Sequence, residues 1–202
     1  MPSTPERSRI VVLASGSGTT VQALLDAPEL RRHIVAVGTD RPGCRAVDRA
    51  RAAGVDTFAV ALPDQPDRAA WNRALEAAIA AHEPDLVVLA GFMRILDVGV
   101  VQRFRIVNTH PALLPAFPGA HALRDALAAG VSHTGVTVHW VDEGVDTGPI
   151  LAQVAVPVEP GDDEDSLRAR VQAAERPLYV RTVTGLVARA ATAATTQKGA
   201  RT

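Results

Sequence analysis

Short apolar runs alternate with amphipathic segments along the first half of the chain. The apolar runs have the length and composition of buried β-strands, and the amphipathic segments repeat their apolar side chains at helical spacing. The expected helices begin after Gly18 and at Cys44, Arg68 and Val98. The expected strands are Ile10–Ala14, Ile34–Val37, Thr57–Val60, Leu86–Ala90 and Ile106–Thr109. This alternation predicts an α/β fold with an open, mainly parallel, twisted sheet that carries helices on both faces.

The pattern changes after the last of these strands. Pro111–Gly119 contains three prolines and one glycine, which predicts an ordered but irregular loop. A helix is expected at Ala122–Ala129. The extended stretches Thr134–Val141 and Ile150–Val158 have no helix between them, so we expect a C-terminal strand pair that is antiparallel.

The ends of the chain differ from this central region. A last helix is expected from about Ser166 into the 180s, with Pro177 kinking or interrupting it. Residues 189–202 are small or polar without an apolar period, so we expect a flexible tail there and a flexible N-terminus at residues 1–8. Residues 9–188 are expected to form a single domain.

Composition narrows the classes of function. The chain has 202 residues, 47% of them hydrophobic, and a formal net charge of -1, so it suits one compact domain and shows no sign of binding nucleic acid or an acidic membrane surface. Cys44 is the only cysteine, which excludes an intramolecular disulfide and a cysteine metal cluster. The histidines lack metal-ligand spacing, so we expect no metal. No signal sequence or membrane-spanning run is visible, so we expect a cytoplasmic protein.

The first candidate site is the segment Ser15–Thr20, which reads Ser-Gly-Ser-Gly-Thr-Thr between a strand and a helix. Glycines at this position let backbone N–H groups approach an anion at the helix N-terminus. The segment lacks the lysine of a Walker A loop and the third glycine of a dinucleotide motif, so the phosphate of a mononucleotide fits better than ATP or NAD. A tight turn without a ligand is equally consistent with these residues.

The second candidate site is the end of the fifth strand. Asn108 and His110 share one face of that strand because side chains alternate along it. Ligands of open parallel sheets bind beyond the carboxyl ends of the strands. An amide and an imidazolium side by side can donate to a developing oxyanion. For His110 alone, a structural role as a hydrogen-bonded strand residue is the simpler interpretation.

Asp146 lies in the middle of a glycine-rich turn, Gly144–Pro149. Its carboxylate either stabilises the turn or points back to the sheet, where it would pair with His110. Two weaker signals remain open. His139 lies on an expected strand and faces either solvent or the edge of the core, and Arg94 either lines a pocket or is a surface charge.

Four segments together resemble the phosphoribosylglycinamide formyltransferases, which are folate-dependent enzymes of purine biosynthesis with a Rossmann-like formyltransferase fold. The resemblance covers about residues 9–185, in the family's order and spacing. The pairing of Asn-x-His-Pro with Val-Asp-x-Gly is specific to folate formyl transfer, and the glycine loop separates this branch from its relatives. The segments are Ser15–Thr20, Leu89–Leu96, Asn108–Gly119 and Gly135–Gly148.

This resemblance implies the roles of individual residues, with Asn108, His110 and Asp146 as the catalytic residues. The N-terminal half would bind the ribonucleotide phosphate and the C-terminal half would complete the folate pocket, with Arg68 near the glutamate tail. The ribonucleotide-binding residues would be Gly18, Thr19, Thr20, Gln172 and Glu175. The folate-binding residues would be Arg68, Met93, Arg94, Ile95, Leu96, Asn108, Val141, Asp142, Glu143, Gly144, Val145 and Asp146.

The chain departs from the family pattern at two positions. Thr20 stands where many members carry Asn, and Ala116 stands where some carry Lys, so contacts with the phosphate would differ there. The family also implies a cis peptide bond between Leu114 and Pro115.

The implied reaction moves the formyl group of 10-formyltetrahydrofolate directly to the amine of glycinamide ribonucleotide, through a tetrahedral intermediate and without a metal. The partners would be these small molecules, and the protein would be a monomer or a homodimer. Related deformylases carry a regulatory domain, and methionyl-tRNA formyltransferases carry a nucleic-acid-binding domain; we expect neither here. A non-catalytic nucleotide-binding module that uses only Ser15–Thr20 would leave Asn108, His110 and Asp146 without a purpose.

Overall fold

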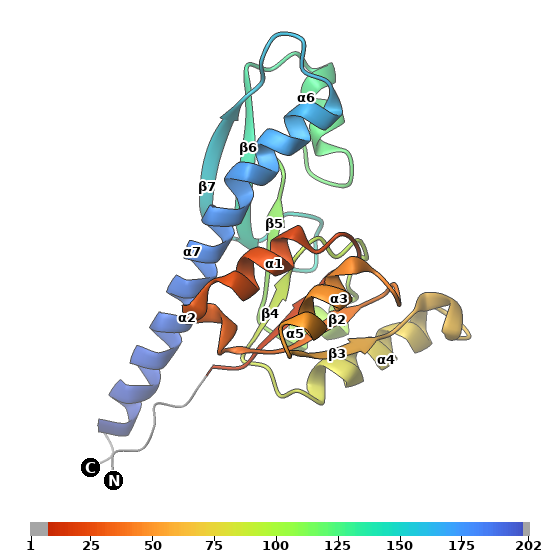
Figure 1. Ribbon diagram of the computed structural model, residues 1–202, viewed down its shortest axis with the longest axis vertical. Helices are drawn as coiled ribbons and strands as arrows, with labels where there is room; N and C mark the ends of the chain where they lie inside the picture. The colour runs from red at the N-terminus through yellow and green to blue at the C-terminus, as the bar shows by residue number, and fades with distance from the viewer. Residues whose placement is uncertain (1–7, 200–202) are drawn as a thin grey trace.

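A single seven-stranded sheet organises the part of the chain that the structure, a computed structural model, describes, which is residues 8–199 (Figure 1). The strands lie side by side in the order β3-β2-β1-β4-β5-β6-β7. Strands β1 to β5 pair parallel, and β6 pairs antiparallel with both β5 and β7. The predicted α/β architecture, including the antiparallel C-terminal pair, is thereby confirmed. The strands are β1 Ile10–Leu13, β2 Ile34–Thr39, β3 Asp56–Ala59, β4 Leu86–Leu89, β5 Ile106–His110, β6 His133–Trp140 and β7 Ile150–Pro157.

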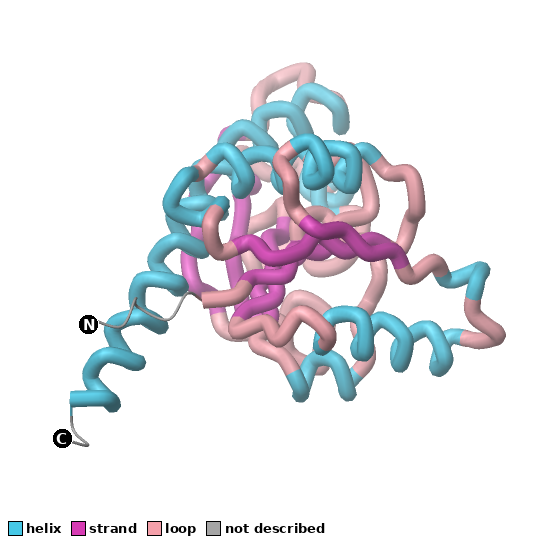
Figure 2. The backbone as a smooth tube through the Cα atoms, turned by 60° about the horizontal axis from the view of Figure 1, so that its bottom comes forward, coloured by secondary structure: helices cyan, strands magenta, loops and turns pink. Residues whose placement is uncertain are grey.

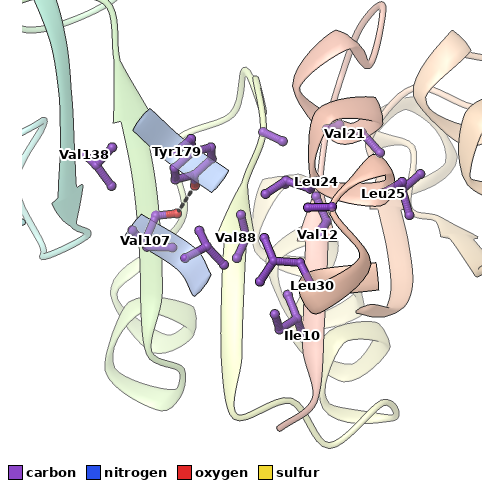
Figure 3. Packing of buried hydrophobic residues seen from close by; sticks show 14 of the residues in the cluster. Ile10, Val12, Val21, Leu24, Leu25, Leu30, Val88, Val107, Val138 and Tyr179 are labelled. Carbon is purple, nitrogen blue, oxygen red and sulfur yellow. Dashed lines mark hydrogen bonds between the residues drawn. The ribbon is translucent and has the colours of Figure 1, made fainter. Parts of the chain in front are cut away.

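Helices cover both faces of this sheet (Figure 2). Strand β1 illustrates why, since its alternate side chains enter two different apolar clusters. Ile10 and Val12 pack with side chains from α1, α3 and α7, whereas Val11 and Leu13 pack with side chains from α4 and α5 (Figure 3 shows the first cluster). The helices are α1 Thr19–Asp26, α2 Pro28–Arg31, α3 Arg45–Ala52, α4 Arg68–Ala80, α5 Val98–Arg103, α6 Ala122–Ala128 and α7 Glu164–Gly199, with a 3-10 turn at Leu62–Asp64.

The last helix corrects its expected end and excludes an interruption at Pro177. Helix α7 runs without interruption through Pro177 and ends at Gly199, beyond the expected end in the 180s. Buried side chains on both sides of the proline, Val171 and Tyr179 among them, pack in the apolar cluster and outweigh the local helix-breaking preference. The Tyr179 hydroxyl also points to the carbonyl oxygens of Leu89 and Val107, 2.9 and 3.0 Å away.

Residues 189–199, which were expected to belong to a flexible tail, are therefore helical. Their flexibility stays a prediction, and residues 1–7 and 200–202 lie outside the described part of the chain. Within residues 8–199, no helix has both the length and the apolar character needed to cross a membrane.

Candidate active site

The side chains of Asn108, His110 and Asp146 come together where β5 and β6 lie side by side. The antiparallel register places Asn108 opposite His139, and His110 opposite Thr137. Asp146 comes from the loop between β6 and β7 and reaches the same place with a left-handed backbone, φ 56°. Gly148 lets this loop fold back, because a Cβ atom there would lie 1.8 Å from the carbonyl oxygen of Trp140.

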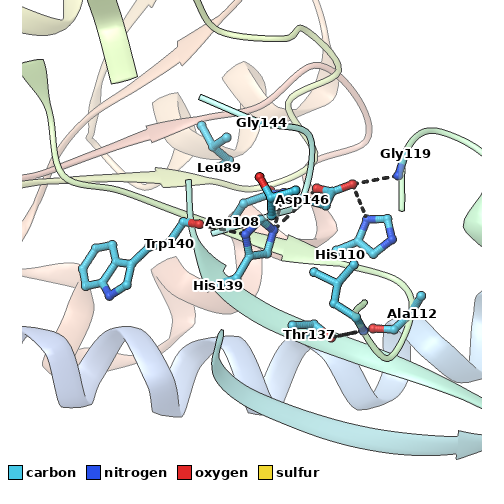
Figure 4. A network of polar contacts seen from close by, with 12 residues as sticks. Leu89, Asn108, His110, Ala112, Gly119, Thr137, His139, Trp140, Gly144 and Asp146 are labelled. Atoms are coloured by element: carbon cyan, nitrogen blue, oxygen red, sulfur yellow. Dashed lines mark hydrogen bonds and ion pairs between the residues drawn. The ribbon is translucent and has the colours of Figure 1, made fainter. Parts of the chain in front are cut away.

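The carboxylate of Asp146 is the centre of this cluster (Figure 4). Its Oδ2 lies 3.3 Å from Nδ1 of His110 and accepts a hydrogen bond from the Gly119 N–H at 2.8 Å. Its Oδ1 lies 3.5 Å from Nε2 of His139, which in turn lies 3.3 Å from Nδ2 of Asn108. The predicted trio of Asn108, His110 and Asp146 therefore comes together, with His139 between two of its members.

Asp146 is held as a carboxylate by its surroundings. Partial burial acts to raise its pKa, but the hydrogen bonds from His139 and from the Gly119 N–H, with the nearby charges of His110 and His139, outweigh burial. The pKa therefore lies below its ordinary value of 3.8. A negative charge therefore lies between the two imidazole rings at neutral pH.

His110 is enclosed, with a side chain that is 5% exposed. Its Nε2 donates to the carbonyl oxygen of Phe117 at 2.8 Å, while its Nδ1 faces Asp146. Both partners are acceptors only, so both contacts are satisfied together only by a doubly protonated ring. Phe117 presents its carbonyl from a left-handed conformation, φ 53°, in the irregular loop that precedes α6.

His139 is the residue that the sequence interpretation missed. Its side chain is 2% exposed and belongs to the cluster, neither to the solvent face nor to the core edge. Its Nδ1 donates to the carbonyl oxygen of Trp140 at 2.8 Å. Nε2 faces both the Asp146 carboxylate and the Asn108 amide, so it donates to Asp146 when it carries a proton and accepts the amide proton of Asn108 when it does not. A polar residue between the apolar Val138 and Trp140 was the available signal, but the pairing with Asn108 depends on strand register.

The irregular loop is fastened to the sheet by a buried hydroxyl group. Thr137 Oγ1 donates to the carbonyl oxygen of Ala112 at 2.7 Å and accepts from the Leu114 N–H at 3.0 Å. Gln153 Nε2 also contacts this hydroxyl, at 2.9 Å. The expected cis peptide bond between Leu114 and Pro115 is present.

The glycine loop connects β1 to α1 at the carboxyl edge of the sheet. Gly18 has φ 70°, and a Cβ atom there would lie 2.5 Å from Cα of Ala46, so only glycine fits. No side chain caps α1, which leaves the N–H groups of its first turn to solvent or a ligand. Arg49 supports the loop by donating from Nε to the carbonyl oxygen of Ser17 at 3.0 Å.

Thr20 and Glu175 meet across the two helices that flank this loop. The Thr20 hydroxyl donates to Oε1 of Glu175 at 3.1 Å. Burial raises the pKa of Glu175 above its ordinary 4.5, although this hydrogen bond and the charge of Arg176 act against burial. The structure thus brings Thr20 and Glu175 together, and Gln172 lies one turn earlier on α7.

Most of the predicted folate residues lie on the two loops that follow β4 and β6, while Asn108 belongs to the cluster itself. On the first loop, Met93 and Ile95 are 68% and 72% exposed, whereas the side chain of Leu96 is buried in the core. Arg68, at the start of α4, donates to the carbonyl oxygen of Ile95 and lies 4.5 Å above the Trp71 ring.

The second loop spans residues 141–146. Val145 is 50% exposed, while the Val141 N–H donates to the carbonyl oxygen of Ile106. Asp142 Oδ1 accepts from the Gly144 N–H and from the Thr147 hydroxyl, which closes the turn. Glu143 accepts from Gln102. Among the described residues, no group of three or more His, Cys, Asp or Glu side chains is placed to hold a metal ion.

The topology of the sheet and the cluster at the carboxyl end of β5 together agree with one protein family. A model of the formyl transferase family matches residues 8–183, and the chain belongs to that family. Over 189 residues it is 57% identical to the phosphoribosylglycinamide formyltransferase of Mycobacterium tuberculosis, in an alignment that covers 92% of this chain and 86% of that protein. It is 41% identical over 175 residues to the phosphoribosylglycinamide formyltransferase of Escherichia coli, covering 84% of this chain and 82% of that protein. These matches confirm the resemblance found in the sequence.

Solved structures agree with this assignment. The glycinamide ribonucleotide transformylase 1 of Symbiobacterium toebii superposes with a TM-score of 0.87 and 42% identity, over 93% of this chain and 91% of that one. The phosphoribosylglycinamide formyltransferase of Streptococcus pneumoniae gives a TM-score of 0.83 and 40% identity, over 89% of this chain and 98% of that one.

Proposed function

We propose that this protein transfers the formyl group of 10-formyltetrahydrofolate to the amine of glycinamide ribonucleotide, giving formylglycinamide ribonucleotide and tetrahydrofolate in purine biosynthesis. The observation that carries the proposal is the convergence of Asn108, His110 and Asp146 at the carboxyl end of β5, on the same side of the sheet as the glycine loop that follows β1. The names of the relatives agree with this reaction.

The ribonucleotide would bind at the glycine loop. Backbone N–H groups of Gly18, Thr19 and Thr20 can hold its phosphate, since the first turn of α1 has no side-chain cap. The Thr20 hydroxyl has one proton, which it donates to Glu175, so phosphate binding would rest on the backbone while that bond persists. Glu175, with Gln172 one turn earlier, would face the ribose.

The folate donor would bind between the two loops next to the trio. Its pterin ring is flat, with polar edges and faces that can pack on apolar groups, and the exposed side chains of Met93, Ile95 and Val145 offer an apolar surface that water does not favour. The backbone of Arg94 and Leu96 and the loop from Val141 to Asp146 would supply polar contacts. Arg68 is exposed beside this surface and suits the carboxylates of a glutamate tail.

The chemistry would need no nucleophile from the protein. As the amine attacks the formyl carbon, negative charge develops on the formyl oxygen, and Asn108 would donate to it. His110 would donate its Nε2 proton, which in this structure goes to Phe117, while Asp146 holds Nδ1. Donors of this kind are each typically worth about 2.7–4 kcal/mol. Asp146 would also help to move the proton from the amine to the leaving nitrogen.

A direct assay tests this function. Purified protein would be given 10-formyltetrahydrofolate with and without glycinamide ribonucleotide, and both tetrahydrofolate and the formylated ribonucleotide would be followed. Formyl transfer that requires the ribonucleotide is expected. Equal release of tetrahydrofolate without the acceptor would show hydrolysis instead, and ribonucleotide binding without transfer would indicate a non-catalytic binding protein.

The wider setting follows from the same substrates. Both are small molecules of central metabolism, so the cytoplasm is the expected compartment, and neither nucleic acid nor a membrane is an expected partner. Residues 9–188 would act as one domain whose two halves each complete one substrate site. Monomer and homodimer remain the expected assemblies.

A further inference from the structure

Asp40 is a buried carboxylate at the sheet edge that the proposed reaction does not use. It follows β2 directly, and its side chain is 0% exposed. Burying a carboxylate lowers the free energy of unfolding unless hydrogen bonds or opposite charges compensate for the lost hydration. Its partners therefore indicate what it holds in place.

The two oxygens of Asp40 bind two different loops. Oδ1 accepts from the Ser15 hydroxyl at 2.5 Å, and Oδ2 accepts from Nε of Arg94 at 2.7 Å. The Ser15 hydroxyl oxygen in turn accepts from the Met93 N–H at 2.9 Å. Ser15 begins the glycine loop and residues 93 and 94 lie in the loop after β4, so one carboxylate links both loops across β1.

The loop 91–96 is fixed by its backbone while its apolar side chains point outward. Its attachments include the Gly91 carbonyl oxygen on the Ser15 N–H, the Met93 N–H on the Ser15 hydroxyl, the Arg94 guanidinium on Asp40, and the Ile95 carbonyl oxygen on Arg68. The side chains of Met93 and Ile95 nevertheless stay 68% and 72% exposed. Because the backbone of the loop is already fixed, it loses little conformational entropy when a ligand covers these side chains.

We propose that Asp40 is a positioning residue for the loop 91–96, which it holds against the glycine loop through Ser15 and Arg94. The affinity for the folate donor then depends on a carboxylate that does not touch the donor. This part rests on the proposed function, which assigns the loop to the folate site. The role of Asp40 in holding the loop 91–96 in place does not depend on which ligand the loop binds.

Two arginines beside Asp40 provide a matched control. Arg94 lies 2.7 Å from Oδ2 and its side chain is 31% exposed, whereas Arg41 lies 4.0 Å from the same oxygen and is 59% exposed. Exposed, distant pairs contribute little because water screens them. Arg41→Gln removes a neighbouring positive charge without removing an attachment of the loop.

Amide hydrogen exchange on the full chain tests the positioning role without any ligand. In Asp40→Ala and in Ser15→Ala, amides of residues 91–96 are expected to exchange about tenfold faster or more, because opening of the loop costs less. Amides of β1 and β4 should keep wild-type exchange, and Arg41→Gln should behave as wild type. Wild-type exchange of the loop in either folded variant, or equal acceleration along the whole chain, would overturn the proposal; Ser15→Ala decides the question if Asp40→Ala does not fold.

Titration calorimetry with tetrahydrofolate and with glycinamide ribonucleotide tests the consequence for binding. The Kd for tetrahydrofolate is expected to rise about tenfold in Ser15→Ala and Asp40→Ala, and the Kd for the ribonucleotide to rise less. An equal or larger loss for the ribonucleotide contradicts a role in positioning the folate loop. Failure of the wild type to bind either molecule would count against the proposed function, and hydrogen exchange would still decide the role of Asp40.

Discussion

Nε2 of His139 lies 3.5 Å from Oδ1 of Asp146, the carboxylate oxygen opposite the one that faces His110. The same nitrogen lies 3.3 Å from the amide of Asn108. One buried histidine therefore contacts two members of the proposed trio. Because Trp140 fixes the other ring nitrogen, the ring cannot turn without losing a hydrogen bond. His139 is placed to set the orientation of both neighbours.

Replacing His139 should slow the reaction more than it weakens substrate binding. In His139→Ala, Asn108 and Asp146 lose a fixed neighbour, and a misplacement of about 1 Å can cost about a hundredfold in rate. We expect kcat to fall about tenfold to a hundredfold, with KM for both substrates changing much less. His139→Gln, whose amide can still meet one of the two neighbours, should recover part of the loss.

His133 provides the control for this experiment, since it is exposed at the start of β6 and its Nδ1 lies 3.1 Å from the Ser132 hydroxyl. Steady-state kinetics of His133→Ala should match the wild type. A normal kcat in folded His139→Ala would show that Asn108 and Asp146 hold their positions without it.

Asp146→Asn tests the charge at the centre of the cluster while the shape is kept. Loss of the carboxylate removes both the partner of His110 and the group proposed to move the proton, so kcat should fall about a hundredfold or more. A near-normal rate constant for formyl transfer in a single-turnover assay would show that Asp146 has no part in the mechanism.

The same variant carries a prediction about pH. The pKa of Asp146 lies below its ordinary 3.8, so the ionised carboxylate stabilises the folded state above that pH and its contribution is lost as pH falls below it. The wild type should therefore be more stable than Asp146→Asn near neutral pH, and the two unfolding midpoints should converge in acid. A constant gap at all pH values would contradict this assignment.

The fold could be read from the sequence because each apolar run is bounded by a turn and followed by an amphipathic segment. β1, for example, alternates between two buried faces, so no polar side chain interrupts the run Ile10–Leu13. The helix is not interrupted at Pro177 because local helix propensity is weaker than the burial of Val171 and Tyr179 on either side of it.

The site could be read only in part. Asn108 and His110 lie two residues apart on one strand, so their proximity follows from the period of the strand. The position of His139 follows instead from the register between β5 and β6, which the intervening irregular loop and α6 determine. Asp40 has no motif around it, and its role depends on two loops that are distant in sequence.

Glu175→Gln should stabilise the protein at neutral pH and weaken ribonucleotide binding. Burial raises the pKa of Glu175 above 4.5, so as pH rises above that value the unfolded chain ionises first and the folded state loses relative stability. A neutral amide removes this effect. The unfolding midpoint of the variant should therefore exceed that of the wild type near neutral pH, and the difference should shrink as pH falls to 4.5 and below.

Binding and stability should move in opposite directions at this residue. The proposed ribose contact would be weakened in Glu175→Gln, so its Kd for glycinamide ribonucleotide should rise while its midpoint rises too. Thr20→Val supplies the comparison, since it removes the donor of the 3.1 Å hydrogen bond and leaves the carboxylate. A more stable variant with wild-type affinity would mean that Glu175 does not face the ribose.

Pro177→Ala should raise stability, because the proline lies inside α7 without an N–H group for the carbonyl oxygen of Ala173. Proline is about 3 kcal/mol less favourable than alanine within a helix. It also restricts the unfolded chain, which offsets about 0.4–1 kcal/mol of that cost. The unfavourable effect of the proline on the helix is the larger of the two, so the midpoint of chemical unfolding should increase in Pro177→Ala. In Pro160→Ala, where an exposed loop proline is replaced, only the second effect acts and the midpoint should fall slightly. A Pro177→Ala midpoint at or below that of the wild type would mean that the packed helix already compensates for the missing bond.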